Sequence, residues 1–390
     1  MYSVPLSVPS LQGNEWKYVQ ECLDEEWVSS AGKYVDLFEK KIADYTGVKN
    51  AVACINGTSA LQVSLRLANV GPGDEVIVPT LTFIAPVNAV TYNSASPVFM
   101  DVDEYYNIDV EKIIQFIKEE TDFGDNGSQI TINRKTGKRI AAIILVHVWG
   151  NAVWQDDLVE VCKENNIAIV EDASESLGTI YTSGKYKGRH TGTIGKLGCL
   201  SFNGNKIITT GGGGMILTDD ETLADKARYL TTQAKDDRIR YIHNEIGYNY
   251  RLTNIQAALG VAQLEQLPGF LKRKHEISLK YQTSLETIEG LSLAKVPDYA
   301  DNNHWMNVLQ IDSNVYGEDR ETLMARLEKN RIQTRPIWHL NHLQKPYVNC
   351  QNYKVDYAKE LVDNSLGLPS SVSLGKKECE MIVNKFGLLK

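Results

Sequence analysis

The sequence lacks the features of a secreted, membrane-spanning or nucleic-acid-binding chain. Residues 1–5 (MYSVP) carry no basic group and begin no apolar run, so we expect no secretory signal. No apolar stretch approaches the roughly 20 residues that cross a bilayer. The formal net charge of -8 argues against binding to nucleic acid or to an anionic membrane. We therefore expect a cytoplasmic protein that binds neither.

Cysteine is also scarce and shows no metal-binding pattern. The 6 cysteines include no C-x-x-C pair, and no histidine or cysteine lies at metal-finger spacing. This pattern predicts free, mostly buried thiols in a reducing compartment, and no metal site.

Short apolar runs alternate with helix-like stretches between residues 50 and 260. The apolar runs are 51–55, 75–78, 97–101, 140–148, 167–171 and 215–218, and the helix-like stretches are 59–69, 82–92, 109–119 and 155–166. Apolar strands separated by helices are typical of a mostly parallel sheet that helices cover on both faces. The sequence therefore predicts an α/β fold for this part of the chain.

The pattern changes after about residue 265. A charged helical stretch over 267–288 is expected to be interrupted near its start by Pro268-Gly269, and a strand at 304–311 and a helix at 319–330 follow. We predict a large domain over residues 1–264 and a smaller α/β domain over residues 265–390. The first 25 or so residues are expected to pack on the smaller domain.

One segment, residues 121–139 (TDFGDNGSQITINRKTGKR), interrupts the α/β pattern. An alternating run at 129–133 lies between the turn-forming pairs Asn126-Gly127 and Thr136-Gly137. This arrangement predicts a small hairpin inserted before the buried strand at 140–148.

Lys206 is the first residue that suggests chemistry. It ends the segment SFNGNK (201–206) and precedes ITT and four glycines at 207–214. A lysine beside a glycine-rich turn between two strands can face a pocket, where partial desolvation leaves its amine neutral often enough to attack a carbonyl. Such a lysine is by itself more often a surface residue, so the prediction depends on its companions.

Asp172 and Phe83 lie where strands end, and open α/β sheets bind ligands at this edge. Asp172 follows the apolar run 167–171 and can pair with a protonated ring nitrogen, although it also fits a helix N-cap. Phe83 follows the run 75–78 and can stack on a planar ring, or it can belong to the core.

The turn Asn56-Gly57-Thr58-Ser59 lies between a predicted strand and a predicted helix. Free amides and hydroxyls at such a helix start can bind phosphate, although the same residues can simply cap the helix. With this turn, the chain carries in order an anchor for a phosphate, an aromatic ring, an acid and an amine. Pyridoxal phosphate requires these four parts, and we predict it as the cofactor.

Over essentially its whole length the sequence resembles the sugar aminotransferases of the DegT/DnrJ/EryC1/StrS family, which have the type I aminotransferase fold. The matching motifs are WVSSAGKYVDLF (27–38), NGTSAL (56–61), GPGDEVIVP (71–79), TF (82–83), EDASESLG (171–178), SFNGNKIITTGGGG (201–214), GYNYRLTNIQAALG (247–260) and TRP (334–336). The resemblance implies a mostly parallel mixed sheet in the large domain.

The resemblance also implies a role for each matching residue. Lys206 corresponds to the Schiff-base lysine, which moves a proton between donor and cofactor, and Asp172 to the partner of the ring nitrogen. The phosphate ligands and the stacking aromatic correspond to Thr58, Ser59, Ser201 and Phe83. Asn249 corresponds to an asparagine that reaches the phosphate from the other subunit, which implies a homodimer with shared active sites.

Glu175 departs from the common family pattern. Many members have glutamine here, near the 3′ oxygen of the cofactor, and a carboxylate beside an anionic oxygen has to be protonated or held by a neighbour. A dehydrating branch of the family has histidine in place of the lysine, so Lys206 is typical of the aminotransferase branch.

The finer resemblance is to enzymes that aminate a nucleotide-linked 4-keto-6-deoxy sugar with glutamate as donor. Segments 203–206 and 335–338 and the insertion at 121–139 are similar to enzymes of bacillosamine and legionaminic acid synthesis, which implies UDP-2-acetamido-2,6-dideoxy-4-keto-glucose as substrate. GDP-perosamine synthases, which use GDP-4-keto-6-deoxy-mannose, share these motifs and are the alternative.

Substrate contacts are expected from residues in segments where the family meets its substrate or the neighbouring subunit. These residues are Trp305, Trp338, His339 and His342, with His304 as a further candidate, and core or interface packing is the alternative for each.

Two other classes of function compete with an aminotransferase. A regulator or binding protein of the same fold would have no use for a reactive lysine. A dinucleotide-dependent oxidoreductase would need a G-x-G-x-x-G turn after an early strand, and the turn after 51–55 is Asn-Gly-Thr-Ser instead. The sequence therefore favours the enzyme.

Overall fold

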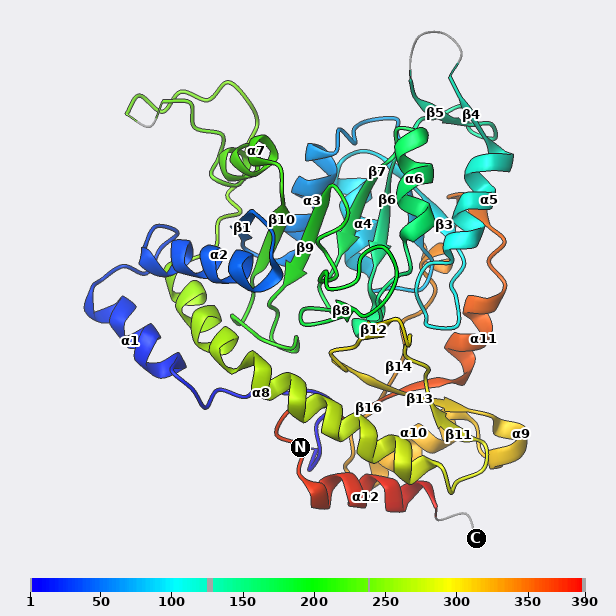
Figure 1. Cartoon of the computed structure of the whole chain (residues 1–390). Helices are drawn as coiled ribbons and strands as arrows, with labels where there is room; N and C mark the ends of the chain where they lie inside the picture. The colour runs from blue at the N-terminus through cyan, green and yellow to red at the C-terminus, as the bar shows by residue number, and fades with distance from the viewer. Residues whose placement is uncertain (1, 125–128, 238, 388–390) are drawn as a thin grey trace.

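The computed structural model of this 390-residue chain describes residues 2–124, 129–237 and 239–387. It has a large part built on an eight-stranded sheet and a smaller part built on a four-stranded sheet. The long helix α8 (Asn254–Leu285) runs along both parts (Figure 1). This architecture confirms the predicted α/β fold.

The large sheet has the strand order β1-β10-β9-β7-β6-β2-β3-β15. The strand bounds are β1 Asn50–Cys54, β2 Glu75–Pro79, β3 Ser96–Met100, β6 Ile140–Val146, β7 Ala168–Asp172, β9 Leu197–Ser201, β10 Gly214–Thr218 and β15 Asn352–Tyr353. Among the described residues, β10 is the one strand of this sheet that runs against the rest. The predicted strands all form, and β9 and β15 are additional ones.

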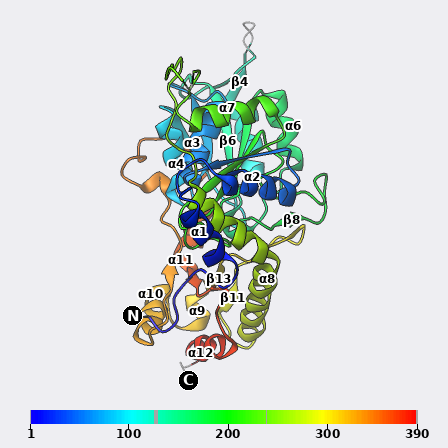
Figure 2. The ribbon, with the colours of Figure 1, turned by 90° about the vertical axis from the view of Figure 1, so that its left-hand side faces the viewer.

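Helices cover both faces of the large sheet. Neighbouring strand residues belong to opposite clusters: Val76 and Val78 face α3 and α4, whereas Ile77 faces α5 and α6. Figure 2 shows α3 and α4 on one side of β6 and α6 on the other. The bounds are α2 Lys33–Thr46, α3 Gly57–Leu67, α4 Ile84–Tyr92, α5 Val110–Glu120, α6 Asp156–Glu164 and α7 Glu221–Thr231. Burial on both faces explains why the strands are continuously apolar.

The smaller sheet has the order β11-β13-β16-β14 and a separate core. Its strands are β11 Leu291–Leu293, β13 Asn307–Ile311, β14 Arg335–Pro336 and β16 Ser365–Leu368, and α10 (Arg320–Lys329), α12 (Lys376–Phe386) and the second half of α8 pack against it. Val4 belongs to the same core and bridges Ile332, while α1 (Glu15–Asp24) packs on α8.

The remaining elements are short. They are the hairpin strands β4 Thr121–Phe123 and β5 Thr131–Asn133, the pair β8 Ile180–Tyr181 and β12 Ala300–Asp301, the helices α9 Ser313–Tyr316 and α11 Tyr357–Asn364, and the 3₁₀ turns η1 Val148–Gly150 and η2 Asn341–Leu343. The hairpin predicted within 121–139 forms, and its predicted Asn126-Gly127 turn lies outside the described residues.

The predicted interruption at Pro268-Gly269 is wrong, because α8 continues through both residues. Proline removes one N–H donor from a helix and normally kinks or breaks it. Here α1 and α2 pack on α8, and so do α12 and β11, and these contacts hold the helix through the defect. The division at 264/265 stays a prediction, and it falls within this continuous helix.

Glu171 fixes the end of β7 from inside the protein. Its carboxylate accepts hydrogen bonds from the backbone N–H groups of Gly192 (2.9 Å), Ile194 (2.6 Å) and Gly195 (2.6 Å). It also lies 2.9 Å from Nε2 of His147, whose Nδ1 accepts from the Val153 N–H, so the network assigns the ring proton to Nε2.

These contacts outweigh the burial of the carboxylate. Burial alone would raise the pKa of Glu171, but the hydrogen bonds from His147 and from backbone N–H groups lower it below 4.5. The charged side chain therefore ties the loop at 192–195 to β7, directly before Asp172.

Glu171→Gln should lower the free energy of unfolding by about 3 kcal/mol at neutral pH, because an amide turns a donor toward groups that are themselves donors. Since the folded pKa is lowered, the stabilisation by Glu171 is present above pH 4.5 and is lost as the pH falls through the folded value. Urea unfolding at two pH values checks both effects, and the variant should lose less stability in acid. The exposed pair Glu160–Lys185 offers the control Glu160→Gln, which should leave the urea midpoint almost unchanged.

Candidate active site

A cavity of about 330 Å³ lies at one edge of the large sheet, where β1, β2, β6, β7 and β9 end and β10 begins. Because parallel strands end at the same edge, residues far apart in the chain meet there. The predicted residues that line the cavity are Thr58, Phe83, Asp172, Glu175, Ser201, Lys206, Trp305 and Trp338. The structure therefore places most of the predicted set around one space.

Lys206 lies inside this cavity and not on the surface. It follows β9 in the turn to β10, and its backbone N–H donates to the Asn203 carbonyl at 3.0 Å. Its side chain is 13% exposed, and Nζ lies 3.2 Å from Oε1 of Glu175. The same Nζ lies 4.1 Å from the ring centre of Trp305. The amine is thus enclosed by an acid and an aromatic face.

Asp172 is a buried carboxylate with few partners. It ends β7, and Oδ1 accepts a hydrogen bond from the Ser174 N–H at 3.0 Å. Burial raises the pKa of Asp172, although Ser174 and the charge of Lys206 act in the opposite direction. Buried charges in proteins are normally paired, so this carboxylate fits a cationic ring nitrogen.

Glu175 lies in the turn after β7 and contacts Lys206. Its Oε2 accepts from the backbone N–H of Trp149 at 2.9 Å, and its Oε1 accepts from Lys206. Burial raises the pKa of Glu175, and the charge of Lys206 lowers it in part. The carboxylate that departs from the family pattern is therefore held by two neighbours in this structure.

The start of α3 forms a cradle of suitable size for an anion. Asn56 caps the helix by accepting from the Ser59 N–H at 2.7 Å, and Gly57 and Thr58 line the cavity. A Cβ on Gly57 would lie 2.8 Å from Cβ of Ser201, so only glycine leaves this space open. The helix start and the hydroxyls of Thr58 and Ser201 fit the phosphate of pyridoxal phosphate.

The predicted role of Ser59 as a phosphate ligand is not supported by its position. Its backbone amide is already bonded to Asn56, its side chain is buried, and it does not line the cavity. Gly57 and Thr58 line the open space, whereas Ser59 belongs to the packed face of α3.

Phe83 lines the cavity as the residue before α4. Its side chain is 54% exposed, which excludes the alternative that it belongs to the core. A ring at this place is free to stack on a planar ligand.

Three other predicted residues do not line the cavity. His342 is bonded through Nδ1 to Oγ1 of Thr80 at 2.6 Å, and burial lowers its pKa. His339 and Asn249 are exposed. His342 therefore lies outside the cavity, its contact with substrate stays a prediction, and Asn249 is placed away from its own cofactor cavity.

Several lining residues were not predicted, among them Ser174, Asn203 and Asn205. Trp149 also contributes, because its N–H bonds Glu175 and its ring stacks on Trp338 at 5.3 Å. Trp149 has a left-handed φ of 54°, which costs energy in a bulky residue. The strand-end rule that identified Asp172 applies equally to Trp149 after β6, and it would have found this residue.

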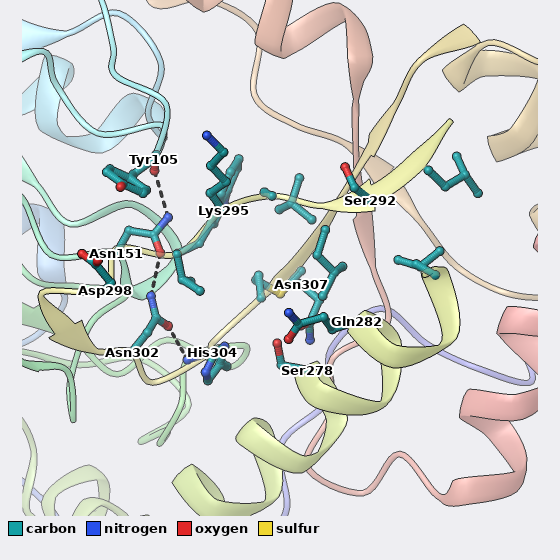
Figure 3. Close-up of a pocket in the computed structure, with 18 of the residues that line it drawn as sticks. Tyr105, Asn151, Ser278, Gln282, Ser292, Lys295, Asp298, Asn302, His304 and Asn307 are labelled. Atoms are coloured by element: carbon teal, nitrogen blue, oxygen red, sulfur yellow. Dashed lines mark hydrogen bonds between the residues drawn. The ribbon is translucent and has the colours of Figure 1, made fainter. Parts of the chain in front are cut away.

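A second cavity of about 560 Å³ lies between α8, β11, β13 and the loops that carry Tyr105 and Asn151 (Figure 3). His304 lines this cavity. None of the residues predicted to bind the cofactor lines this second cavity. We therefore assign the chemistry to the cavity that contains Lys206.

The comparisons with known proteins agree with this geometry. The model of the DegT/DnrJ/EryC1/StrS aminotransferase family matches residues 9–387. GDP-perosamine synthase from Escherichia coli O157:H7 is 38% identical, covering 99% of this chain and 99% of its own. GDP-perosamine synthase from Caulobacter vibrioides is 36% identical, covering 97% of this chain and 96% of its own.

A solved structure has the same fold. The DegT DnrJ EryC1 StrS aminotransferase from Brucella abortus superposes with a TM-score of 0.84 at 27% identity, covering 96% of this chain and 94% of its own. The likeness therefore extends over both sheets and α8.

Gly57→Ala should weaken the binding of pyridoxal phosphate by about tenfold or more, because the new methyl group would collide with Ser201 and overpacking costs about 1–3 kcal/mol. Titration of the apo protein with the cofactor, followed by absorbance, measures the effect. Gly71→Ala is the matched control, since a Cβ there meets nothing within 4 Å. Equal affinity in both variants would show that the α3 start does not hold the cofactor.

Proposed function

The chain belongs to the DegT/DnrJ/EryC1/StrS aminotransferase family, and we propose that it transfers an amino group to C4 of a nucleotide-linked 4-keto-6-deoxy hexose. The protein is a pyridoxal-phosphate-dependent sugar aminotransferase. The observation that carries the proposal is the position of Lys206, whose amine lies in a cavity with a buried Asp172 and a helix start.

Each residue of the cavity then has a task. Bound pyridoxal phosphate supplies an aldehyde and a ring that accepts the electrons of a broken C–H bond. Lys206 would hold the aldehyde and move the proton, and Asp172 would keep a proton on the ring nitrogen. Gly57, Thr58 and Ser201 would bind the phosphate and Phe83 would stack on the ring, with Glu175 beside Lys206. Water is limited around the amine, since Lys206 is mostly buried.

The sugar substrate is proposed to be GDP-4-keto-6-deoxy-mannose. This choice is supported by the two relatives named GDP-perosamine synthase, which favour the alternative over the UDP-linked sugar that the motifs first suggested. Glutamate as the amino donor is proposed from the family. Trp338 lines the cavity and stacks on Trp149, so we assign it to the wall that meets the sugar.

We also propose a homodimer with shared active sites. The loop between α7 and α8 projects from the body (Figure 1), and its described residues include exposed Ile239, Tyr241, Ile242 and Ile246. An apolar group of this kind on a projecting loop is typical of an interface. Asn249 lies in the same loop and is exposed, so it is accessible to a second copy of the chain.

The purified enzyme with glutamate should convert GDP-4-keto-6-deoxy-mannose to a 4-amino sugar. We expect a kcat/KM about tenfold or more above that for UDP-2-acetamido-2,6-dideoxy-4-keto-glucose, because the pocket has to discriminate both the base and the 2-substituent. Product mass and NMR at C4 measure the reaction, and Lys206→Ala should abolish turnover with either sugar. A higher kcat/KM for the UDP-linked sugar would support that sugar as the substrate instead. A product that has gained no nitrogen would contradict an aminotransferase.

Shared sites predict complementation between two inactive chains. A heterodimer of a Lys206→Ala chain and an Asn249→Asp chain should regain about half of the wild-type activity, because one of its two sites has both native residues. The Asp carboxylate repels the phosphate in the other site. Co-expression with two affinity tags and assay of the purified heterodimer test this, each variant alone serving as control. If the heterodimer stays inactive, Asn249 does not act on the partner's site.

A further inference from the structure

The free amine of Lys206 has two direct contacts in this structure. Nζ lies 3.2 Å from Glu175 Oε1 and 4.1 Å from the ring centre of Trp305. Trp305 is only 4% exposed, and a desolvated cation over an indole face is strongly attracted to it. Lys206 has to leave the cofactor and return in every catalytic cycle, so these contacts define where the detached amine waits.

The indole of Trp305 is fixed to the same turn that carries the lysine. Its Nε1–H donates to the carbonyl of Asn205 at 2.7 Å, directly before Lys206 in the chain. Its backbone N–H donates to Oδ1 of Asn303 at 2.9 Å. The ring therefore moves with the backbone of Lys206.

Asn303 connects the two contacts of the amine. Its buried side-chain amide donates to the carbonyl of Glu175 at 2.9 Å and to that of Leu177 at 3.0 Å. Its oxygen accepts from Trp305. The side-chain amide of Asn303 therefore fixes the distance between Glu175 and Trp305, the two residues that contact the Lys206 amine.

A buried lysine holds the same segment from the other side. Nζ of Lys274 on α8 donates to the carbonyl of Trp305 at 2.8 Å and also to the carbonyl of Ser370. Burial lowers the pKa of Lys274 to about 7, and within the described part of the chain no acidic side chain pairs with it. A buried amine is costly, and here its hydrogen bonds go to the backbone that carries Trp305.

The segment between Asn302 and Trp305 is held in a strained form. His304 has a left-handed φ of 48°, and its N–H donates to Oδ1 of Asn302 at 2.6 Å. Asn302 in turn donates to Oδ1 of Asn151 at 2.6 Å (Figure 3). Strain of this kind persists only where surrounding bonds impose it, and it gathers at functional sites.

We propose that Trp305 is a positioning residue for Lys206, and that the segment Asn302–Trp305 holds its ring as a platform for the detached amine. The proposal rests on the proposed role of Lys206 as the cofactor lysine. It gives Trp305 a task different from the substrate contact that its place in the sequence suggested. The ring of Trp305 keeps the Lys206 amine in one place, so the amine returns quickly to the aldehyde of the cofactor.

The test compares aromatic and aliphatic side chains at position 305 in the full-length apo protein. Stopped-flow absorbance follows attachment of added pyridoxal phosphate, in which the Lys206 amine adds to the aldehyde carbon and one water leaves. Trp305→Leu and Trp305→Met should each slow attachment about tenfold, because misplacement of a reacting group costs this much or more. Trp305→Phe, which keeps a ring face, should stay within about threefold of wild type.

A second readout does not depend on the cofactor. Trinitrobenzenesulfonate labels free amines, and peptide mass spectrometry reports the rate at Lys206. The aliphatic variants should label faster, since the amine has lost its cover, while they attach the cofactor more slowly. Trp154→Leu is the matched control, because Trp154 packs on Tyr299 and does not line the Lys206 cavity.

The outcomes separate the two proposals. A pure packing role would slow Phe, Met and Leu variants alike, and that result, or wild-type rates in all of them, would overturn the platform. If wild-type protein formed no cofactor band at all, the proposed function would fail, while a faster labelling of Lys206 in the aliphatic variants would still support the platform. The two aliphatic side chains differ in shape, so one remains informative if the other does not fold.

Discussion

Three carboxylates lie buried at residues 171–175, and the need to compensate their charge shapes this protein. Glu171 is satisfied entirely by the chain, through His147 and three backbone N–H groups, so its pKa is lowered despite burial. Asp172 and Glu175 are not satisfied to that extent, and burial raises their pKa values. The carboxylate of Glu171 stabilises this edge of the sheet, whereas those of Asp172 and Glu175 give the edge an affinity for cations. Lys206 and a protonated ring nitrogen are the cations that fit.

The strand directions turn this local requirement into a site. Because β1, β2, β6, β7 and β9 run the same way, their ends deliver a helix start, an aromatic ring, the acids and the lysine to one edge. The smaller part of the chain then adds Trp305 and Trp338. The amine of Lys206 thus lies between the carboxylate of Glu175, in the turn after β7, and the ring of Trp305, which follows α8 in the chain.

Much of this arrangement could be predicted from residue patterns. Continuous apolar strands predicted the doubly covered sheet, and the strand-end rule placed Asp172 and Phe83. The pattern failed where packing outweighs local preference, as at Pro268, which α8 tolerates because both of its halves are packed. The strand β9 (LGCLS) was missed because it contains Gly198, a poor strand former, which is required here because a Cβ at this position would lie 1.9 Å from the Gly192 carbonyl oxygen. The role of Trp305 beside Lys206 could not be predicted, since it depends on contacts between distant segments. Residue spacing does not indicate the class of substrate, and this class was inferred from the likeness to sugar aminotransferases.

The attachment point of the cofactor is the most direct test. Borohydride adds hydride to the carbon–nitrogen double bond between a lysine and pyridoxal phosphate and makes the link permanent. After reduction of the loaded protein and digestion, peptide mass spectrometry should find the cofactor's mass on Lys206 and on no other lysine. Cofactor mass on another lysine, such as the buried Lys274, or no labelled peptide from protein shown to be folded, would contradict the assignment of Lys206.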